Sequence, residues 1–505
     1  MTARVKAGRL ASASIDYTKL TKKIPPTIVW LRRDLRIGDN PALHHAAKSD
    51  KPVLIIYIDQ LKPGDLWSMG AASMWWLHHS LKSLAADLKL IGGRLRIFQG
   101  DPKAIVTKLI TETGADTVLW NRRYEPDAIA KDKLLKTHLS GKKIDVRSFP
   151  GNLCHEPWTV KRQENHPYKV FTAYWRASLK HESLKVTTTP GKLKSYRGKL
   201  SAETTLKELK LLPSRDWATR FTTVWAPGES SAKKMLAALI KRKLANYQTN
   251  RDIPSVEGTS RLSAHLAFGE ISPRQVHAEV QRALVNKKIA ADDNTETFLR
   301  EIGWREFAVH LLYHFPHTTD EPLDPRFNKM PWSKVVKKDL HRWQQGNTGI
   351  PLVDAGMRQL WQTGWMHNRV RMVAGSFLIK NMGYHWLEGA RWFWDTLVDA
   401  DLASNTMGWQ WVAGSGADAA PYFRVFNPVR QGERFDPGGD YIREWVPEIS
   451  GLSNKTIHAP WTASSEELNA ASIILGQNYP LPIVELSTSR LDALARFQQI
   501  KQAAR

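Results

Sequence analysis

The segment 399–424 combines residue types that can bind a flat ligand and carry charge. Carboxylates, an amide and two tryptophans lie there among Gly, Ala and Ser. Small residues let a ligand approach the backbone, and Trp is rarely fully buried, so this mixture indicates rings that face a ligand. A tight, packed loop between helices is the alternative interpretation. The residues concerned are Asp399, Asp401, Asn405, Trp409 and Trp411.

A helical pattern near residue 300 brings a carboxylate close to an aromatic ring. Glu301, Trp304 and Arg305 are spaced three and four residues apart, so they share one helix face. A surface ion pair beside a core Trp would have this spacing. A pocket that reads a nucleobase would also need a carboxylate beside an aromatic plane, and both interpretations stay open.

The stretch 364–372 places unusual polarity on a helix. Asn368, Arg371 and Met372 fall on one face, and Arg369 turns toward another. Helix interiors seldom bury so much polarity without a ligand or partner, so the pattern indicates a binding site. His367 has no second His or Cys at metal spacing, and we therefore expect no metal ion.

A short hydroxyl-rich motif precedes a helical run at 264–268. Hydroxyls, backbone N–H groups and an arginine at a helix start can hold phosphate, although ordinary N-capping uses the same residue types. The motif consists of Thr259, Ser260, Arg261, Leu262 and Ser263.

Three tryptophans in separate segments, Trp332, Trp386 and Trp409, could form a relay of rings for electron transfer. Each one taken alone would be interpreted as a core residue.

The elements that must position these residues fall into two kinds. Short Val- and Ile-rich runs alternate with helical patterns near 41–48, 70–91, 102–113 and 126–139, which predicts a doubly wound parallel five-stranded sheet with a Rossmann-like arrangement. The expected strands are 27–31, 53–58, 95–98, 117–120 and 144–149.

No Gly-x-Gly-x-x-Gly follows the first strand, so a dinucleotide fingerprint is absent there. Ligands of such sheets lie beyond the strand ends at a switch point. Residues 121–125 follow the fourth strand and could line that site, or could form an exposed polar loop.

Beyond residue 150 the alternating pattern ends. Helical patterns then run over 230–247, 272–287, 294–314, 334–345, 352–363, 366–382, 387–397 and 402–411. We expect an α/β domain and an all-α domain. The expected limits are a basic disordered tail at 1–26, the α/β domain at 27–150, a long linker at 151–229 and a helical domain at 230–505.

Composition narrows the class of protein. A formal net charge of +24 over 505 residues favours a polyanionic partner such as nucleic acid, with a merely solvated basic surface as the alternative. The single cysteine excludes an intrachain disulfide and a four-cysteine cluster, and it fits a reducing compartment. No apolar run approaches the roughly 20 residues needed to cross a bilayer, so we expect no membrane association.

Several motifs together resemble the photolyase/cryptochrome family. They occur in order over about 27–461, at 32–36, 39–43, 259–263, 304–307, 365–372 and 399–424. Further motifs resemble the bacterial class III cyclobutane pyrimidine dimer photolyases. These motifs lie at 75–81, 112–116, 121–124 and 479–484.

The resemblance implies a U-shaped FAD in the helical domain. It assigns phosphate binding to Tyr247 and 259–263, a charge pair beside the isoalloxazine to Arg371 and Asp399, and further cofactor contacts to Asp401. Asn405 would face flavin N5. Trp409, Trp386 and Trp332 would form the photoreduction chain.

The implied activity is that of a deoxyribodipyrimidine photo-lyase, in which light drives electron donation from FADH⁻ to a flipped pyrimidine dimer. Glu301 would stabilise the dimer radical anion. The other substrate and DNA residues implied are Trp304, Arg305, Asn368, Arg369, Met372, Trp411, Arg424 and Gln431.

Departures from other branches favour repair over the alternative, a cryptochrome-like photoreceptor without repair activity. Enzymes for (6-4) photoproducts resemble this chain but carry histidines where Asn368 and Met372 stand, and cryptochromes usually replace Asn405 by Asp or Cys. Only 44 residues follow Trp461. The class III resemblance further implies a methenyltetrahydrofolate antenna with unassigned residues, and we expect a monomer acting in the bacterial cytoplasm on nucleoid DNA.

Overall fold

Five parallel strands form one sheet in the order β3-β2-β1-β4-β5. The computed structural model describes residues 24–60, 66–162, 166–419 and 423–502, so most of the expected basic tail lies outside the described residues. β1 and β2 are buried along their whole length, as their continuous apolar runs predicted. The strands are β1 Thr27–Leu31, β2 Val53–Asp59, β3 Leu95–Gln99, β4 Thr117–Asn121 and β5 Asp145–Phe149.

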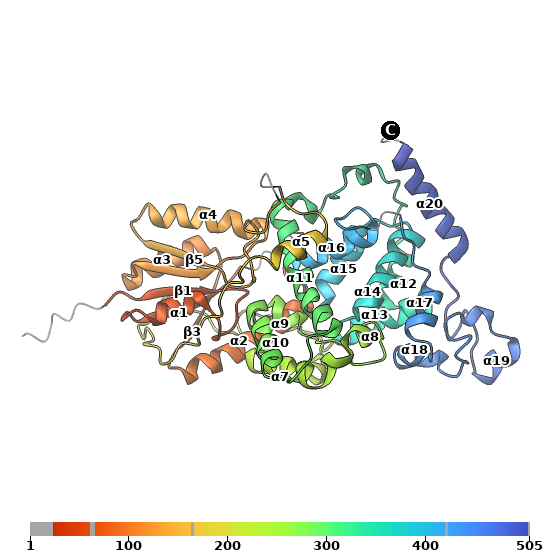
Figure 1. Ribbon diagram of the computed structural model, residues 1–505, viewed down its shortest axis with the longest axis horizontal. Coiled ribbons are helices and arrows are strands. Elements are labelled where there is room, and N and C mark those ends of the chain that lie inside the picture. The colour runs from red at the N-terminus through yellow and green to blue at the C-terminus, as the bar shows by residue number, and fades with distance from the viewer. Residues whose placement is uncertain (1–23, 61–65, 163–165, 420–422, 503–505) are drawn as a thin grey trace, which may run out of the picture.

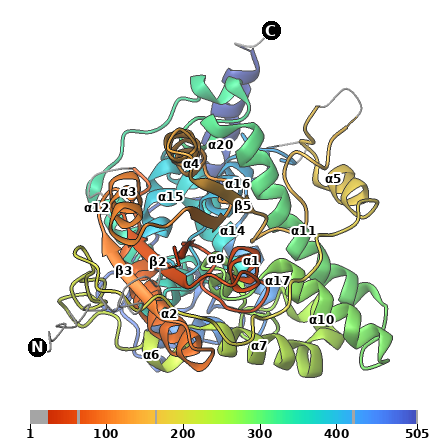
Figure 2. The same ribbon diagram turned by 90° about the vertical axis from the view of Figure 1, so that its left-hand side faces the viewer.

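Helices cover both faces of this sheet (Figure 2). α1 Pro41–Ala47 and α2 Ala71–Leu90 pack on one face, and α3 Pro102–Thr113 and α4 Pro126–Ser140 pack on the other. The doubly wound α/β fold expected from the sequence is therefore confirmed. Because the strand order reverses between β1 and β4, a crevice opens beyond the carboxyl ends of these two strands.

The remaining helices form a second, larger part of the molecule (Figure 1). The predicted all-α fold is confirmed, but some boundaries were wrong. The helix expected over 230–247 gives way to a π-helix at Leu239–Lys243 and a 3₁₀ turn at Leu244–Asn246, and the one expected over 366–382 ends in a π-helix at Phe377–Asn381. The helices are α7 Glu229–Ala238, α8 Tyr247–Asn250, α9 Ser263–Ala267, α10 Pro273–Val285, α11 Asp293–His314, α12 Lys337–Gln345, α13 Pro351–Thr363, α14 Asn368–Ser376, α15 Trp386–Thr396, α16 Leu402–Ala413, α17 Pro428–Phe435, α18 Asp440–Trp445, α19 Ser465–Ala470 and α20 Leu486–Gln502.

Helix α16 occupies the centre of the helical part. It packs against α11, α14 and α15, and Trp409 within it belongs to the largest apolar cluster. Among the described residues, no helix is both long enough and apolar enough to cross a bilayer.

The connection at 151–229 is fastened to the sheet instead of running free. Val53 donates its N–H to the carbonyl of Lys194, and Tyr196 donates back to the carbonyl of Val53. The connection also contains two helices that its composition did not predict, α5 Phe171–Ser178 and α6 Phe221–Val224. We propose the domain limits expected from the sequence, with this segment attached to the α/β domain.

A buried charge cluster joins the two parts of the molecule. Asp39, in the loop after β1, accepts hydrogen bonds from Arg274 at 2.9 Å and from Ser272, both at the start of α10. It also accepts the N–H of Thr187 in the connection. Asp39, Arg274 and Ser272 are almost fully buried, so this carboxylate links three segments that lie far apart in the sequence.

Replacing Asp39 by Asn should destabilise the protein strongly, because the buried Arg274 then loses its charged partner. We expect the free energy of unfolding to fall by about 3 kcal/mol or more, measured by urea denaturation. Asp50→Asn is the control, since Asp50 pairs with Lys194 on the exposed surface and should leave the midpoint unchanged. Equal midpoints for the two variants would contradict the anchoring role of Asp39.

Candidate functional site

A buried ion pair lies where α14 meets the chain before α16. One guanidinium nitrogen of Arg371 is 2.8 Å from Asp399 Oδ2, and Arg371 Nε donates to the carbonyl of Met366 at 2.7 Å. The other carboxylate oxygen, Asp399 Oδ1, is buried and has no partner among the described residues. A buried carboxylate oxygen without a donor indicates that a ligand supplies one.

Asp401 does not join this pair. Its carboxylate accepts the N–H of Ser404 at 2.9 Å and caps α16, and its side chain lines a separate cavity between the two parts of the molecule. The structure therefore brings Arg371 and Asp399 together but directs Asp401 elsewhere.

The hydroxyl-rich motif 259–263 leads into α9. No side chain of the described residues caps this helix, so the interpretation of ordinary N-capping loses support. Arg261 adopts a left-handed backbone conformation, with φ of 51°. Its guanidinium and that of Arg371 lie over the same Trp365 ring, at 4.8 and 6.0 Å from the centroid, which links the motif to the buried ion pair.

These groups form one donor set. Backbone N–H groups and hydroxyls at the start of α9 suit phosphate, and the Arg371–Asp399 pair suits a polar, flat ring. Tyr247 is buried nearby against Phe298, with ring centroids 5.3 Å apart. The residues present thus fit a dinucleotide that carries phosphates and a planar heterocycle.

Helix α16 directs different side chains to different neighbours. Asn405 donates its amide to the carbonyl of Ala390 at 3.1 Å, which orients it toward α15. Trp409, four residues later on the same face, is buried against Phe393 and Trp343. Gln410 donates to the carbonyls of Thr318 and Glu321 at 2.7 and 2.8 Å, and this fixes the rotation of the helix.

The predicted ring relay is partly continuous in space. Trp332 lies 5.0 Å from His385, and His385 stacks on Trp386 at 5.7 Å. Gly389, one turn after Trp386, approaches Trp409 so closely that an added Cβ would lie 2.0 Å from the ring. The α15 segment therefore connects the surroundings of Trp409 to half-buried Trp332, through a histidine that sequence reasoning missed.

A second group of predicted residues lies on the other sides of α11, α14 and α16. Trp304 stacks face to face on Phe171 of α5, with centroids 3.6 Å apart. Asn368 and Met372 are neighbours on α14, with the amide nitrogen 3.9 Å from the sulfur. Trp411 is half-buried and donates to the carbonyl of Asp418 at 3.1 Å. These side chains come from three helices, of which α16 packs on both α11 and α14.

The residues predicted to hold the DNA backbone divide into two sets. Arg369 pairs with Asp252 at 2.6 Å, and Arg424 is exposed in the segment after α16. Gln431, on α17, has a buried amide oxygen without a partner among the described residues. Arg305 does not belong with them, because it donates to the carbonyl of Asn152 at 3.1 Å and lines the cavity between the two parts of the molecule.

Sequence reasoning missed Arg251, which pairs with Glu301 at 2.9 Å. In the sequence, only its position one helical turn after Tyr247 could have indicated that Arg251 belongs to the site. Burial raises the pKa of the Glu301 carboxyl, and Arg251 opposes that shift.

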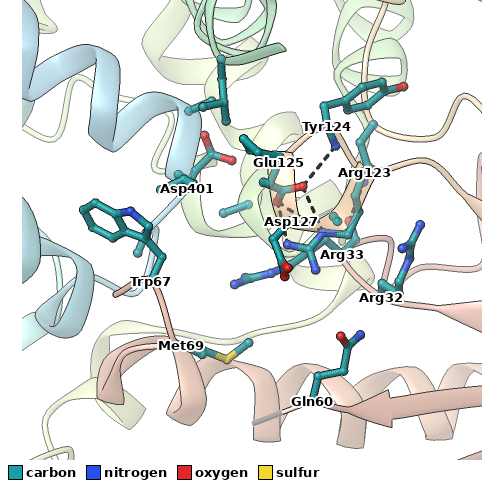
Figure 3. A pocket seen from close by; sticks show the side chains of 18 of the residues that line it. Arg32, Arg33, Gln60, Trp67, Met69, Arg123, Tyr124, Glu125, Asp127 and Asp401 are labelled. Carbon is teal, nitrogen blue, oxygen red and sulfur yellow. Dashed lines mark hydrogen bonds and ion pairs between the residues drawn. The ribbon is translucent and has the colours of Figure 1, made fainter. Parts of the chain in front are cut away.

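A cavity of about 580 Å³ lies at the crevice between β1 and β4 (Figure 3). The structure places residues 122–125 in its lining, as the sequence suggested, whereas Asn121 is buried and donates to Asp34 and Asn40. Burial would raise the pKa of Glu125, but Arg123 and Arg33 lower it to about 2. Arg33 has a buried guanidinium nitrogen without a partner among the described residues, so the cavity suits an anionic ligand.

Residues 27–191 match the family model described as DNA photolyase, and residues 298–499 match the FAD binding domain of DNA photolyase. These matches span both parts of the fold and contain most of the residues described above. The chain belongs to the photolyase/cryptochrome family.

Among individual proteins, the chain is similar to the deoxyribodipyrimidine photo-lyase of Agrobacterium fabrum, with 46% identity over 96% of this chain and 100% of that protein. It is 36% identical to cryptochrome-1 of Arabidopsis thaliana, over 95% of this chain and 71% of the cryptochrome. The solved structure of a class III photolyase from Agrobacterium tumefaciens superimposes with a TM-score of 0.91 at 45% identity, covering 96% of this chain and 100% of that one.

Substituting Gly389 by Ala should force Trp409 to move, because the added methyl would lie 2.0 Å from its ring. Overpacking of this kind costs about 1–3 kcal/mol, measurable by chemical denaturation. Gly408→Ala is the control, since no atom lies within 4 Å of its added Cβ in α16 and Ala favours helix. A Gly389→Ala protein as stable as Gly408→Ala would contradict the close contact.

Proposed function

We propose that this protein is a light-driven DNA lyase that splits cyclobutane pyrimidine dimers with FAD held in its helical domain. The observation that carries the proposal is the arrangement around α16. Asp399 pairs with Arg371 just before this helix, Trp409 packs against the α15 segment of the ring relay, and Trp411 is half-buried on another side beside Asp418 and Phe426. The similarity to proteins named deoxyribodipyrimidine photo-lyase supports the same activity.

The FAD site consists of the donor set described above. Arg371 and Asp399 hold the ring system, and Asn405 presents a neutral amide that does not deliver a proton to it. Asp401 contributes to the site indirectly, because its carboxylate caps the first turn of α16. When bound in its fully reduced form, FAD supplies a light-driven electron. The residues that hold its phosphates and ribityl chain are Tyr247, Thr259, Ser260, Arg261, Leu262 and Ser263.

The dimer occupies the space beside α11, α14 and α16. Enzymes that act on a base in a duplex, photolyases among them, must extrude it, and a dimer that stacks poorly lowers this cost. Trp304 and Trp411 form the walls, and Glu301 stabilises the added electron through a hydrogen bond to a dimer carbonyl. Asn368 and Met372 complete the lining. Arg369, Arg424 and Gln431 contact the DNA backbone, and the net charge of +24 strengthens phosphate binding.

The relay Trp409, Trp386 and Trp332 would supply electrons from the protein surface to a bound, oxidised flavin. His385 fills the space between the last two rings. Gly389 allows α15 to reach Trp409.

We infer that the cavity between β1 and β4 holds a second chromophore, 5,10-methenyltetrahydrofolate in this class of photolyase. Arg33, with a buried guanidinium nitrogen that has no partner among the described residues, suits one of its carboxylates, and Trp67 offers a ring face (Figure 3). The absorption spectrum of the purified protein tests this inference. A spectrum with flavin bands alone would contradict it.

We further propose a monomer that acts in the bacterial cytoplasm on nucleoid DNA.

Reduced protein should remove thymine dimers from an oligonucleotide under blue light and leave them intact in the dark.

Trp304→Ala should weaken dimer binding by about 10- to 100-fold, since stacking on an aromatic ring contributes about 1–3 kcal/mol per base. Trp361→Ala is the control, because Trp361 is 53% exposed and stacks on Trp392 away from the proposed site. A protein that binds flavin but leaves dimers intact under light would instead be a photoreceptor of the cryptochrome kind.

A further inference from the structure

Two adjacent ion pairs lie at the mouth of the proposed dimer site. Arg251 contacts Glu301 of α11 at 2.9 Å, and the next residue, Asp252, contacts Arg369 of α14 at 2.6 Å. The Arg369 guanidinium also lies 4.3 Å from the centroid of the Phe435 ring. All four charged side chains are between 20% and 33% exposed, so solvent and a polyanion can reach them from one side.

Together, the two ion pairs carry no net charge at the entrance to the proposed dimer site. Each guanidinium is paired with one carboxylate, so a phosphate that binds either arginine competes with that carboxylate. A DNA phosphate that binds Arg251 competes with Glu301 for the guanidinium. Where the phosphate draws the guanidinium away, Glu301 keeps its partly buried position but loses its closest cation.

Burial and neighbouring charges together set the protonation state of Glu301. Burial raises the pKa of its carboxyl, while Arg251 lowers it by charge and by hydrogen bonding. Asp252 raises it further, and Arg300, on α11 itself, lowers it. Tyr247 also faces the carboxylate, and burial keeps its hydroxyl neutral by raising its pKa. Without Arg251, the remaining influences favour the neutral acid.

We propose that Arg251 is a positioning residue that couples DNA binding to the protonation of Glu301. As the phosphate takes the guanidinium, Glu301 accepts one proton from solvent and becomes a hydrogen-bond donor to a dimer carbonyl. Charge balances, because the carboxylate that Arg251 leaves is neutralised by that proton while the phosphate takes its place. The inference rests on the proposed function and extends it to the order of events at the site.

The test is proton uptake by the FAD-loaded protein when it binds a thymine-dimer oligonucleotide in the dark. Calorimetry in two buffers of different ionisation enthalpy measures it near neutral pH. If the pKa of Glu301 rises on binding, as proposed, binding should take up protons, to a limit of one per complex. Affinity should then fall with rising pH by up to about tenfold per pH unit between the two pKa values.

Glu301→Gln should abolish the uptake and flatten the pH dependence. Arg251→Gln should also abolish it, since no guanidinium then moves from Glu301 to the phosphate. Glu388→Gln is the control. Glu388 pairs with Arg391 at 3.7 Å on the surface of α15, and this variant should keep the full uptake.

The outcomes separate this inference from the proposed function. Wild-type protein that binds and repairs dimers without proton uptake would overturn the coupling alone. Uptake that persists in Glu301→Gln or in Arg251→Gln would overturn it as well. Failure to bind or repair dimer DNA at all would overturn both proposals.

Discussion

The rotation of helix α16 about its own axis is the constraint on which the site depends. Gln410 is almost fully buried, and its amide bonds to the carbonyls of Thr318 and Glu321 while its oxygen accepts the N–H of Leu323. Each such bond contributes about 1 kcal/mol, and an unpaired buried amide would cost more. Because successive helical residues turn by a fixed angle, this anchor directs Trp409 into the core and Trp411 to another side, beside Asp418 and Phe426.

The N-terminal end of α16 is held by charge. Asp401 caps its first turn, and Asp399, two residues earlier, is paired with Arg371 of α14. A buried ion pair recovers its desolvation cost only with good geometry and further hydrogen bonds, so such a pair contributes little to stability on its own. Its retention is consistent with a role in binding, and the partnerless Asp399 Oδ1 agrees with that role.

The elements were predictable because their signals are local. Continuous Val and Ile runs define β1 and β2, and the apolar periodicity of α13 and α15 is visible in the sequence. Side-chain partners were less predictable, because they depend on distant segments. Arg305 shares a helix face with Glu301 in the sequence pattern, yet it lines the interdomain cavity, and Arg251 meets Glu301 only through tertiary packing. The π-helices at 239–243 and 377–381 likewise have no local signal that we could recognise.

The central claim is that Trp409 serves flavin photoreduction and Trp411 serves dimer binding. Two variants, Trp409→Phe and Trp411→Ala, test it most directly. Each protein is assayed for photoreduction of its oxidised flavin and, after chemical reduction, for repair of a dimer-containing oligonucleotide. We expect Trp409→Phe to lose photoreduction and keep repair, and Trp411→Ala to keep photoreduction and lose roughly tenfold or more in repair. Loss of both activities in both variants, or of neither, would contradict the account.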